Sequence, residues 1–436
     1  MRDIAFMCVL LAACGMALRH PWVGIVGWTI ISIMNPHRTM WHVTNYPVAA
    51  MVAVCTLIGI LATRDRKGMT WRPEVAFLVL FTLWMTAMFL FTLYPRYSYD
   101  MWDRVMKINF MIVVAIYVMH DRRQIMALAW ALVFSLGWFG AKGGLFTLIN
   151  GGNYRVWGPP DSFIEGNNEL ALALIVAIPL MQFVRKQTTR AWVRHALLAT
   201  MALSAFAAIG SHSRGALLAI VAMGFWFWLR SDKKLPVGMA LAVLGVALLS
   251  VMPAEWFSRM ETIESYQDDS SAMGRINAWT MAWNLAVDRF PVGGGFAIYE
   301  PDVFMRYAPD PGSIHAAHSI YFQVLGEHGF IGLFLMLAMW LCVWFNFGWL
   351  RKHARANPAT AWAADLGAMG QVALVGYAVG GAFLSLAYFD LPYNILVLGV
   401  VARRWVASRA WEHEDERGQA LALEPGGLAR RTVEAG

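Results

Sequence analysis

Charged side chains are scarce in this sequence. They make up 14% of its 436 residues, whereas 58% are hydrophobic. A soluble protein of this size carries roughly a quarter charged residues. The apolar residues form long blocks with few charges inside, rather than amphipathic stripes, as at 74–93, 125–148, 235–252 and 330–350. Blocks of that length predict transmembrane helices and argue against a soluble enzyme.

Cysteine is also rare, and its positions exclude two common roles. The sequence has four cysteines, all inside apolar runs: Cys8, Cys14, Cys55 and Cys342. We interpret them as small buried side chains rather than a disulfide set or a thiolate metal cluster. The sequence also lacks a repeat of fixed period, so the paired halves typical of transporters are not visible. The N-terminus lacks a cleavable signal pattern, and we expect the first apolar run to be retained as a span.

The residues that are present give the chain an orientation. Twenty-one tryptophans suit a membrane protein, because indoles favour the two membrane interfaces. The net charge of +7 could suggest nucleic-acid binding, but Lys and Arg cluster in short alternate loops. These loops fall on one side of the membrane if the helices alternate, and the positive-inside rule makes that side cytoplasmic. They are residues 63–72, 120–123, 185–194, 230–234 and 351–355.

The predicted fold is an all-α polytopic membrane protein with about 12 transmembrane helices. The first two apolar segments are short and separated only by Arg19, His20 and Pro21, so they form either a hairpin or two tilted spans. The predicted helices are 4–18, 21–35, 46–62, 74–94, 104–119, 124–148, 168–184, 193–211, 214–230, 235–252, 329–350, 362–386 and 391–406.

Polar residues concentrate in one long excursion, 253–327, between N-terminal spans (1–252) and C-terminal spans (328–410). The remaining residues, 411–436, predict a disordered cytoplasmic tail. We expect the excursion to cover a cavity that opens on the non-cytoplasmic side. Its parts, in order, are an acidic stretch (Glu261, Glu264, Asp268, Asp269), an amphipathic helix (Met273–Arg289), Pro291 with Gly293–Gly295, and a loop to His315 and His318.

Two arginines on the predicted outer face are candidate anion ligands. Arg214 stands between two apolar runs, where it either snorkels at a helix end or forms an anion site beside a helix N-terminus opened by Ser213. Arg275 follows Gly274 at the start of the loop helix, where a charge is ordinary. Together the two guanidinium groups could bind a diphosphate and stabilise its charge without a metal.

Two histidines precede the span at 329. His318 is a candidate general base, because a near-neutral imidazole can take a proton from an attacking hydroxyl. His315 lies one turn earlier, so the pair could also provide two metal ligands on one helical face. No cysteine or clear carboxylate accompanies the pair, and a plain interfacial histidine is the third interpretation.

Further polar residues on the same face are candidate cavity contacts. The string NYRVWGPPDSFIEGNNELAL is dense in polar residues that either contact sugars or headgroups, or simply cap the entry of the next helix. Arg104 and Lys107 begin another span and either snorkel or face the cavity. The polar residues singled out in the string are Arg155, Asp161, Glu165, Asn167 and Asn168.

Three motifs, in this order, resemble the O-antigen ligase family of bacterial inner-membrane glycosyltransferases. They are SRGALLAI from Ser213, GRINAWTMAWNLAVDRFPVGGG from Gly274, and AHSIYFQVLGEHGFIGLF from Ala317. Pro291, Gly293, Gly295, Ala317 and His318 match the family pattern, whereas Ser319 stands where asparagine is common. The N-terminal half, with VWGPPDSFIEGNNELALAL, is similar to the branch of O-glycosylation ligases.

The resemblance implies a GT-C-like fold with the excursion in the periplasm. It also implies an inverting transfer, without metal or cofactor, of a glycan from undecaprenyl diphosphate to an acceptor hydroxyl. Carried over to this sequence, Arg214 and Arg275 bind the diphosphate. His318 serves the acceptor hydroxyl or helps to hold the donor.

The acceptor is open at this point. A lipid A–core acceptor makes the chain a ligase, a protein Ser or Thr makes it an O-oligosaccharyltransferase, and a growing glycan makes it a polymerase. A transporter of lipid-linked glycan is a different class. It would place charges at mid-membrane in both halves, whereas the candidate residues here gather on one face. The expected partners are the lipid-linked donor, its acceptor and membrane lipids, with no nucleic acid.

Overall fold

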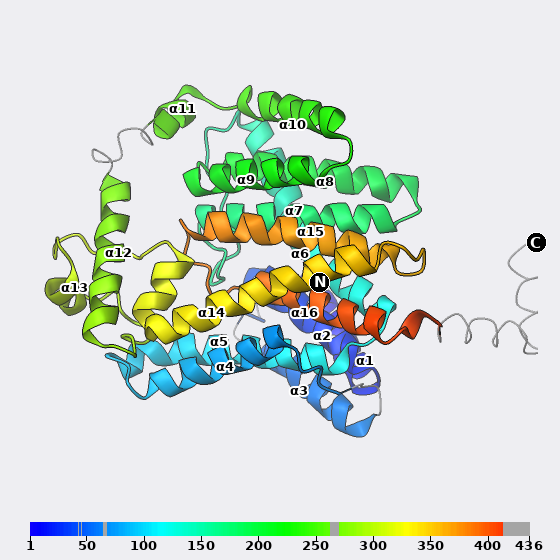
Figure 1. Cartoon of the computed structure of the whole chain (residues 1–436), viewed down its shortest axis with the longest axis horizontal. Coiled ribbons are helices and arrows are strands. Elements are labelled where there is room, and N and C mark those ends of the chain that lie inside the picture. Colours follow the sequence, from blue (N-terminus) through cyan, green and yellow to red (C-terminus); the bar gives the residue numbers. More distant parts are fainter. Residues whose placement is uncertain (42, 45, 64–67, 262–269, 413–436) are drawn as a thin grey trace, which may run out of the picture.

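The computed structural model describes residues 1–412 apart from 42, 45, 64–67 and 262–269, and every regular element in that part of the chain is a helix (Figure 1). Residues 264, 268 and 269 of the acidic stretch and the tail from 413 lie outside the described residues. The helices are α1 (Arg2–Arg19), α2 (Pro21–Met34), η1 (Pro36–Thr39), α3 (Val48–Ala62), α4 (Pro73–Phe89), α5 (Pro95–Val118), α6 (Arg122–Ile149), α7 (Asn167–Gln187), α8 (Ala191–Ile209), α9 (Arg214–Arg230), α10 (Lys234–Leu249), α11 (Ala254–Glu261), α12 (Ser270–Asp288), α13 (Pro301–Tyr307), α14 (Ile320–His353), α15 (Ala361–Gly381) and α16 (Asp390–Ala407).

The all-helical prediction is confirmed for the described residues, and each predicted apolar segment coincides with a helix. One starting point was wrong. The helix predicted from 104 begins at Pro95, because proline at the first position starts a helix in the polar stretch ahead of the apolar run. The helix predicted from 329 coincides with the second segment of α14, which follows the non-helical Gly329, whereas the first segment, from Ile320, was not predicted.

Within the residues that the structure describes, four helices are long and apolar enough to cross a membrane: α6, α7, α8 and α14. Four shorter apolar helices, α2, α3, α4 and α10, accompany them. Helices suit a bilayer because they satisfy their backbone hydrogen bonds internally. The count of about 12 spans stays a prediction.

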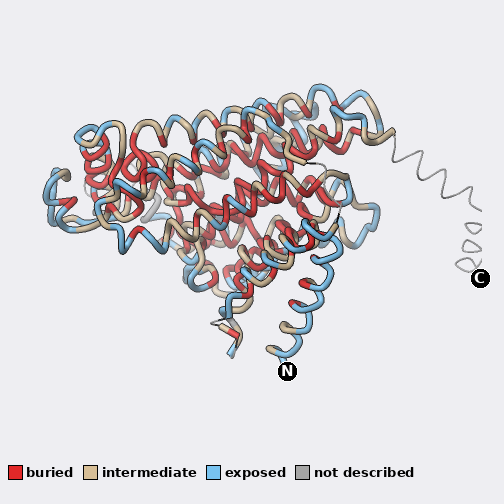
Figure 2. Tube along the Cα trace, turned by 90° about the horizontal axis from the view of Figure 1, so that it is seen from below, coloured by how far each residue is buried: buried red, intermediate tan, exposed pale blue. Residues whose placement is uncertain are grey.

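The distribution of apolar side chains fits a lipid environment. α7 is buried along most of its length, whereas α10 buries only Leu248. The outward face of α10 exposes Leu235, Met239, Val243 and Val246 by 61–75%. Such a continuous apolar surface is unfavourable in water and suits contact with acyl chains. Figure 2 shows the buried residues running through the centre of the bundle, while α1 stands beside it with its surface largely exposed.

The helices of the excursion gather at one end of the bundle. α11, α12 and α13 lie at the left of Figure 1, and the chain leaves α16 at the opposite end. α12 packs along the first part of α14 and also contacts α13. The predicted amphipathic helix 273–289 is α12, which therefore lies across the ends of the long helices and adjoins the start of α9 and α14.

Candidate functional site

Arg214 is the first residue of α9, as predicted, and the turn before it is tightly held. The Ser213 hydroxyl accepts a hydrogen bond from the Ala216 N–H (3.2 Å) and caps the helix. His212 Nε2 lies 2.8 Å from the Gly152 carbonyl oxygen, and Asn167 Nδ2 donates to the Ser211 carbonyl (2.7 Å). The end of α6 and the start of α7 thus fix the position from which the half-buried Arg214 side chain extends.

Arg275, on α12, lines the same pocket as Arg214. The pocket measures about 210 Å³. Apart from the two arginines its wall is almost entirely apolar, made by Gly215, Leu218, Ala272, Ile276, Trp279 and Phe383. Two guanidinium groups above an apolar wall suit an anion that carries a hydrocarbon chain. The structure therefore brings together the two arginines that the sequence placed 61 residues apart.

α12 also holds the loop that leads to His318. The Asn277 side-chain amide donates to the carbonyls of Asp310 (2.8 Å) and Ser313 (2.9 Å) and accepts from the Asp310 N–H (2.9 Å). Trp279 Nε1 donates to the Ala317 carbonyl (2.6 Å), and its ring stacks on Phe322 with 5.0 Å between centroids. These contacts fix the position of the loop relative to α12, which also carries Arg275.

His318 has a left-handed backbone conformation, with φ of 43°. A residue other than glycine held in this region costs about 1–3 kcal/mol, and such residues cluster at functional sites. Burial, with the positive charge of Arg275 and the nearby His315, lowers the pKa of His318 to about 4. The imidazole is therefore neutral at physiological pH and able to accept a proton.

Glu169, which sequence reasoning did not single out, lies beside His318. Its Oε1 is 3.8 Å from His318 Nδ1, and its side chain is only 17% exposed. It stands in the first turn of α7, and the charge of Arg275 acts on it as well as on His318. The signal available in the sequence was a carboxyl side chain at the start of an apolar run. The sequence alone does not show that this side chain lies beside a loop about 150 residues further along the chain.

The HxxH pair does not have the predicted helical geometry. α14 begins at Ile320, so His315 and His318 both lie in the preceding loop rather than on one helical face. His315 packs against Gly274, where an added Cβ would be 2.8 Å from its Nδ1, and this nitrogen is 3.3 Å from the Ser313 hydroxyl. Within the described residues, no three His, Cys, Asp or Glu side chains form a group suited to a metal ion.

The remaining candidate contacts lie around a different part of this face. Arg104 donates to the Asp161 carbonyl (2.7 Å) and sits over the Phe163 ring, while Asp161 also pairs with Arg38 (3.5 Å). Lys107 forms an ion pair with Asp103 at 2.5 Å. With His37 and Arg38, Lys107 lines a second pocket of about 530 Å³, which has no lining residue in common with the Arg214–Arg275 pocket.

Arg155 and Glu165 belong to the loop before α7, and Asn168 belongs to the helix itself. The Glu165 carboxylate accepts a hydrogen bond from the Asp161 N–H (3.0 Å), so it closes this loop on itself. Arg155 is exposed, and Asn168 is half-buried in the first turn of α7. Asn167 ties the loop to the turn before α9, as described above, which favours the helix-entry interpretation for that residue.

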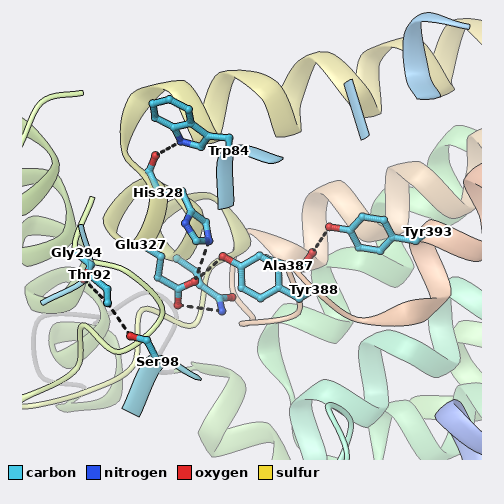
Figure 3. Close-up of polar contacts among 10 residues, drawn as sticks. Trp84, Thr92, Ser98, Gly294, Glu327, His328, Ala387, Tyr388 and Tyr393 are labelled. Atoms are coloured by element: carbon cyan, nitrogen blue, oxygen red, sulfur yellow. Dashed lines mark hydrogen bonds and ion pairs between the residues drawn. The ribbon is translucent and has the colours of Figure 1, made fainter. Parts of the chain in front are cut away.

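The triple glycine fastens the excursion to the break in α14. The Gly294 and Gly295 N–H groups donate to the carbonyls of Gly326 (2.8 Å) and Glu327 (2.9 Å), and Trp84 Nε1 donates to the His328 carbonyl (2.9 Å; Figure 3). These carbonyls end the first segment of α14, because Gly329 leaves the helical conformation. Groups that would be unsatisfied at a helix end are thereby paired.

A second buried polar cluster, also missed from the sequence, lies beneath this joint (Figure 3). Glu327 accepts hydrogen bonds from the Tyr388 hydroxyl (2.5 Å) and Gln323 Nε2 (3.3 Å), and its Oε2 is 3.9 Å from His328 Nε2. Phe296 packs edge-on against the His328 ring. The sequence interpretation assigned Glu327 to a solvated loop, although an ionisable residue inside a span is itself a functional signal.

Two family models match parts of this chain. Residues 199–337 match the family described as O-Antigen ligase, and this range includes Arg214, Arg275 and His318. Residues 1–189 match a family of unknown function, DUF5935. No curated protein matches the chain. The match over residues 199–337 thus supports the resemblance to the O-antigen ligase family.

Proposed function

We propose that the protein is an inverting glycosyltransferase that moves a glycan from undecaprenyl diphosphate to a hydroxyl of lipid A–core at the periplasmic face of the bacterial inner membrane. The observation that carries this proposal is the shared pocket of Arg214 and Arg275, with His318 held beside Arg275. The match of residues 199–337 to the O-antigen ligase family supports a glycosyltransferase of the ligase or polymerase type.

The chemistry follows from where the charges lie. The diphosphate of the donor binds between Arg214 and Arg275, whose planar donors match its oxygens. Neutral His318 takes the proton of the acceptor hydroxyl as that oxygen attacks the anomeric carbon from the side opposite the diphosphate. The bond from this carbon to the diphosphate oxygen breaks, and the two guanidinium groups stabilise the charge that develops on the leaving group. The sugar configuration inverts.

The orientation is part of the proposal. We place the end of the bundle that carries α11–α13 in the periplasm, and we count about 12 spans. The basic connections 185–194, 230–234 and 351–355 support this orientation, because they join helices at the other end. The two arginines of the pocket come from the start of α9 and from α12, at one end of the bundle. This also supports an enzyme over a transporter, which would place charges at mid-membrane in both halves.

The direct test is transfer in proteoliposomes that contain the purified protein, a polyprenyl-diphosphate-linked oligosaccharide and lipid A–core. We expect a product in which the oligosaccharide is joined to lipid A–core with inverted anomeric configuration. A parallel reaction replaces lipid A–core by a Ser-containing peptide or by a second oligosaccharide chain. Product with the peptide alone would indicate a protein transferase instead of a ligase. Product with the second oligosaccharide alone would indicate a polymerase.

The companion test uses a deletion strain. Loss of the gene is expected to remove the long-chain lipopolysaccharide bands, because the polysaccharide can no longer be joined to lipid A–core. A plasmid copy of the gene should restore them. An unchanged banding pattern would contradict the lipid A–core acceptor.

A further inference from the structure

The carboxylate of Glu169 is held in one position. Glu169 is the third residue of α7, and its Oε2 lies over Gly166, close enough that a Cβ on this glycine would collide with it. The side chain therefore folds back over the helix start instead of extending into solvent. The first N–H groups of a helix lack intrahelical partners and can donate to a carboxyl in this position.

The nitrogen of His318 that faces Glu169 has no partner of its own. Nδ1 is buried and forms no hydrogen bond with any other described residue, and the nearest carboxylate oxygen, Glu169 Oε1, is 3.8 Å away. This is slightly beyond a hydrogen bond. Catalytic hydrogen bonds are often long before substrate binds, and they shorten in the complex. About a third of the His318 side chain is exposed, which leaves room for an acceptor hydroxyl to reach the ring.

The two side chains arrive from rigid and separate supports. Glu169 is fixed by the start of α7, and His318 by the left-handed backbone of a loop that α12 holds. An ordinary helix-capping glutamate interacts only with its own helix start. Here the same carboxylate also lies opposite an unpartnered imidazole nitrogen, and that second observation indicates a role beyond capping.

We propose that Glu169 is the positioning residue for His318, an inference that rests on the proposed transferase function. The Glu169 carboxylate accepts a hydrogen bond from His318 Nδ1–H. This fixes the tautomer in which Nε2 carries the free electron pair. Nε2 then takes the proton of the acceptor hydroxyl while the oxygen bonds to the anomeric carbon and the diphosphate leaves with the electron pair of the broken bond. Glu169 stabilises the imidazolium until its proton passes to water.

Glu169→Gln tests this role, with Glu300→Gln as the matched control. Glu300 carries a half-buried carboxyl on the same face that makes no capping hydrogen bond at the start of α13. A glutamine amide can donate to Nδ1 and stabilise the wrong tautomer. We expect kcat of Glu169→Gln to fall by roughly 10²–10⁴-fold. KM for the donor and direct binding of a fluorescent polyprenyl diphosphate should stay within a few-fold, and the control should retain wild-type rates.

A second variant keeps the test decisive if the glutamine protein does not insert. Glu169→Asp retains the charge at the helix start but withdraws the carboxylate by one methylene, and its kcat is expected to fall about tenfold with donor binding kept. Wild-type kcat in either variant would overturn the proposal. A loss of donor binding as large as the loss of rate would also overturn it, since it would place Glu169 in the donor site.

Failure of the inference and failure of the proposed function look different. If the wild-type protein transfers glycan and His318→Asn does not, while Glu169→Gln keeps its rate, only the role of Glu169 is wrong. If the wild-type protein forms no product with any acceptor in the reconstituted assay, the proposed function itself is wrong.

Discussion

The side chain of Arg275 has two sets of neighbours. On one side it shares an apolar-walled pocket with Arg214. On the other side its charge acts on His318 and Glu169. In the proposed mechanism, a single cation that adjoins both the pocket for the diphosphate and the proton acceptor would couple donor binding to the protonation state of His318. An anionic diphosphate at Arg275 would offset its repulsion of a protonated imidazole.

Replacing either arginine of the pocket by lysine is expected to reduce kcat/KM by about tenfold to a hundredfold, because an ammonium group cannot reproduce a bidentate guanidinium contact. The variants are Arg214→Lys and Arg275→Lys, measured in the reconstituted assay. Arg306→Lys is the matched control, because Arg306 is largely exposed on α13, where it pairs with Asp288 at 3.2 Å and lies over the Tyr307 ring. Wild-type rates in both pocket variants would favour snorkelling at the membrane interface.

The pH profile of kcat/KM tests His318. Its pKa is lowered from 6.5 to about 4 by burial, Arg275 and His315. The base is therefore neutral, and the rate should be level between about pH 6 and 8 and fall only below about pH 5. Protonation favours unfolding, because the folded-state pKa is the lower one, so stability falls from pH 6.5 towards 4 and then levels off.

A variant of His318 separates this residue from the other titrating groups. His318→Asn is the suitable replacement, because asparagine tolerates the left-handed backbone better than alanine. We expect it to abolish transfer. We also expect thermal stability to fall less between pH 6.5 and 4 than in the wild-type protein. Retained activity would remove His318 from the mechanism, and an activity optimum near pH 6.5 would contradict the lowered pKa.

Chelation with EDTA is expected to leave the transfer rate within twofold of the untreated protein. The reason is that two guanidinium groups can supply the positive charge that a diphosphate leaving group requires. The measurement is an initial rate after dialysis against the chelator, with a magnesium-dependent glycosyltransferase treated alongside. Loss of activity that a divalent ion restores would return His315 and His318 to the metal-ligand interpretation.

At the scale of elements, the decisive feature is the joint between the Gly293–Gly295 turn and the break in α14. Two glycine N–H groups donate to carbonyls of α14 on one side, and the Leu93 N–H donates to the Gly294 carbonyl (2.8 Å) on the other. The turn thus connects α14 to the α4–α5 connection. The first segment of α14, residues 320–328, begins two residues after His318 and ends at this joint. The joint therefore holds the C-terminal end of that segment.

Gly293→Ala is expected to loosen this joint. A Cβ at position 293 would lie 2.5 Å from the Glu327 carbonyl carbon and the Gly326 oxygen, so the turn must move away from α14. Overpacking of this kind destabilises by about 1–3 kcal/mol. Thermal unfolding in detergent should show a lower midpoint, with transfer reduced in parallel. Gly312→Ala is the control, since its Cβ would meet only the Asp310 side chain, at 3.5 Å. An equal unfolding midpoint in both variants would contradict the stabilising role of this joint.

Sequence reasoning predicted the helices better than their joints. Apolar runs predict spans because a bilayer demands them, and Ser213 before Arg214 predicts a cap through local chemistry. The break at Gly329 depends on a left-handed residue (φ 68°) packed against Pro291 and Val292, which only the fold brings there. For the same reason Arg214, Arg275 and His318 were found from local motifs, whereas Glu169 and the cluster around Glu327 required tertiary contacts.

At the scale of the whole molecule, the helical bundle has two chemically different ends. The excursion with the candidate site lies at one end, and the basic connections lie at the other (Figure 1). Apolar side chains exposed on α10 and elsewhere lie between the two ends. This arrangement predicts that the end with α11–α13 faces the periplasm.

Cysteine accessibility measures that orientation. In a background with the four native cysteines replaced, a cysteine at Asp310, exposed in the excursion, should react with an impermeant maleimide in intact spheroplasts. A cysteine at Arg355, whose side chain is 78% exposed at the opposite end, should react only after lysis. The reverse pattern would put the excursion in the cytosol and end the proposed function.

The uneven lining of the Arg214–Arg275 pocket has a consequence for how a substrate arrives. Leu218 and Phe383 belong to the wall from which the two guanidinium groups extend. For a donor of the proposed class, the isoprenoid tail can remain dissolved among acyl chains while only its headgroup enters protein. The enzyme then has no need to extract its carrier from the bilayer. Lateral diffusion within the leaflet, rather than release into water, would deliver each donor and remove each spent carrier.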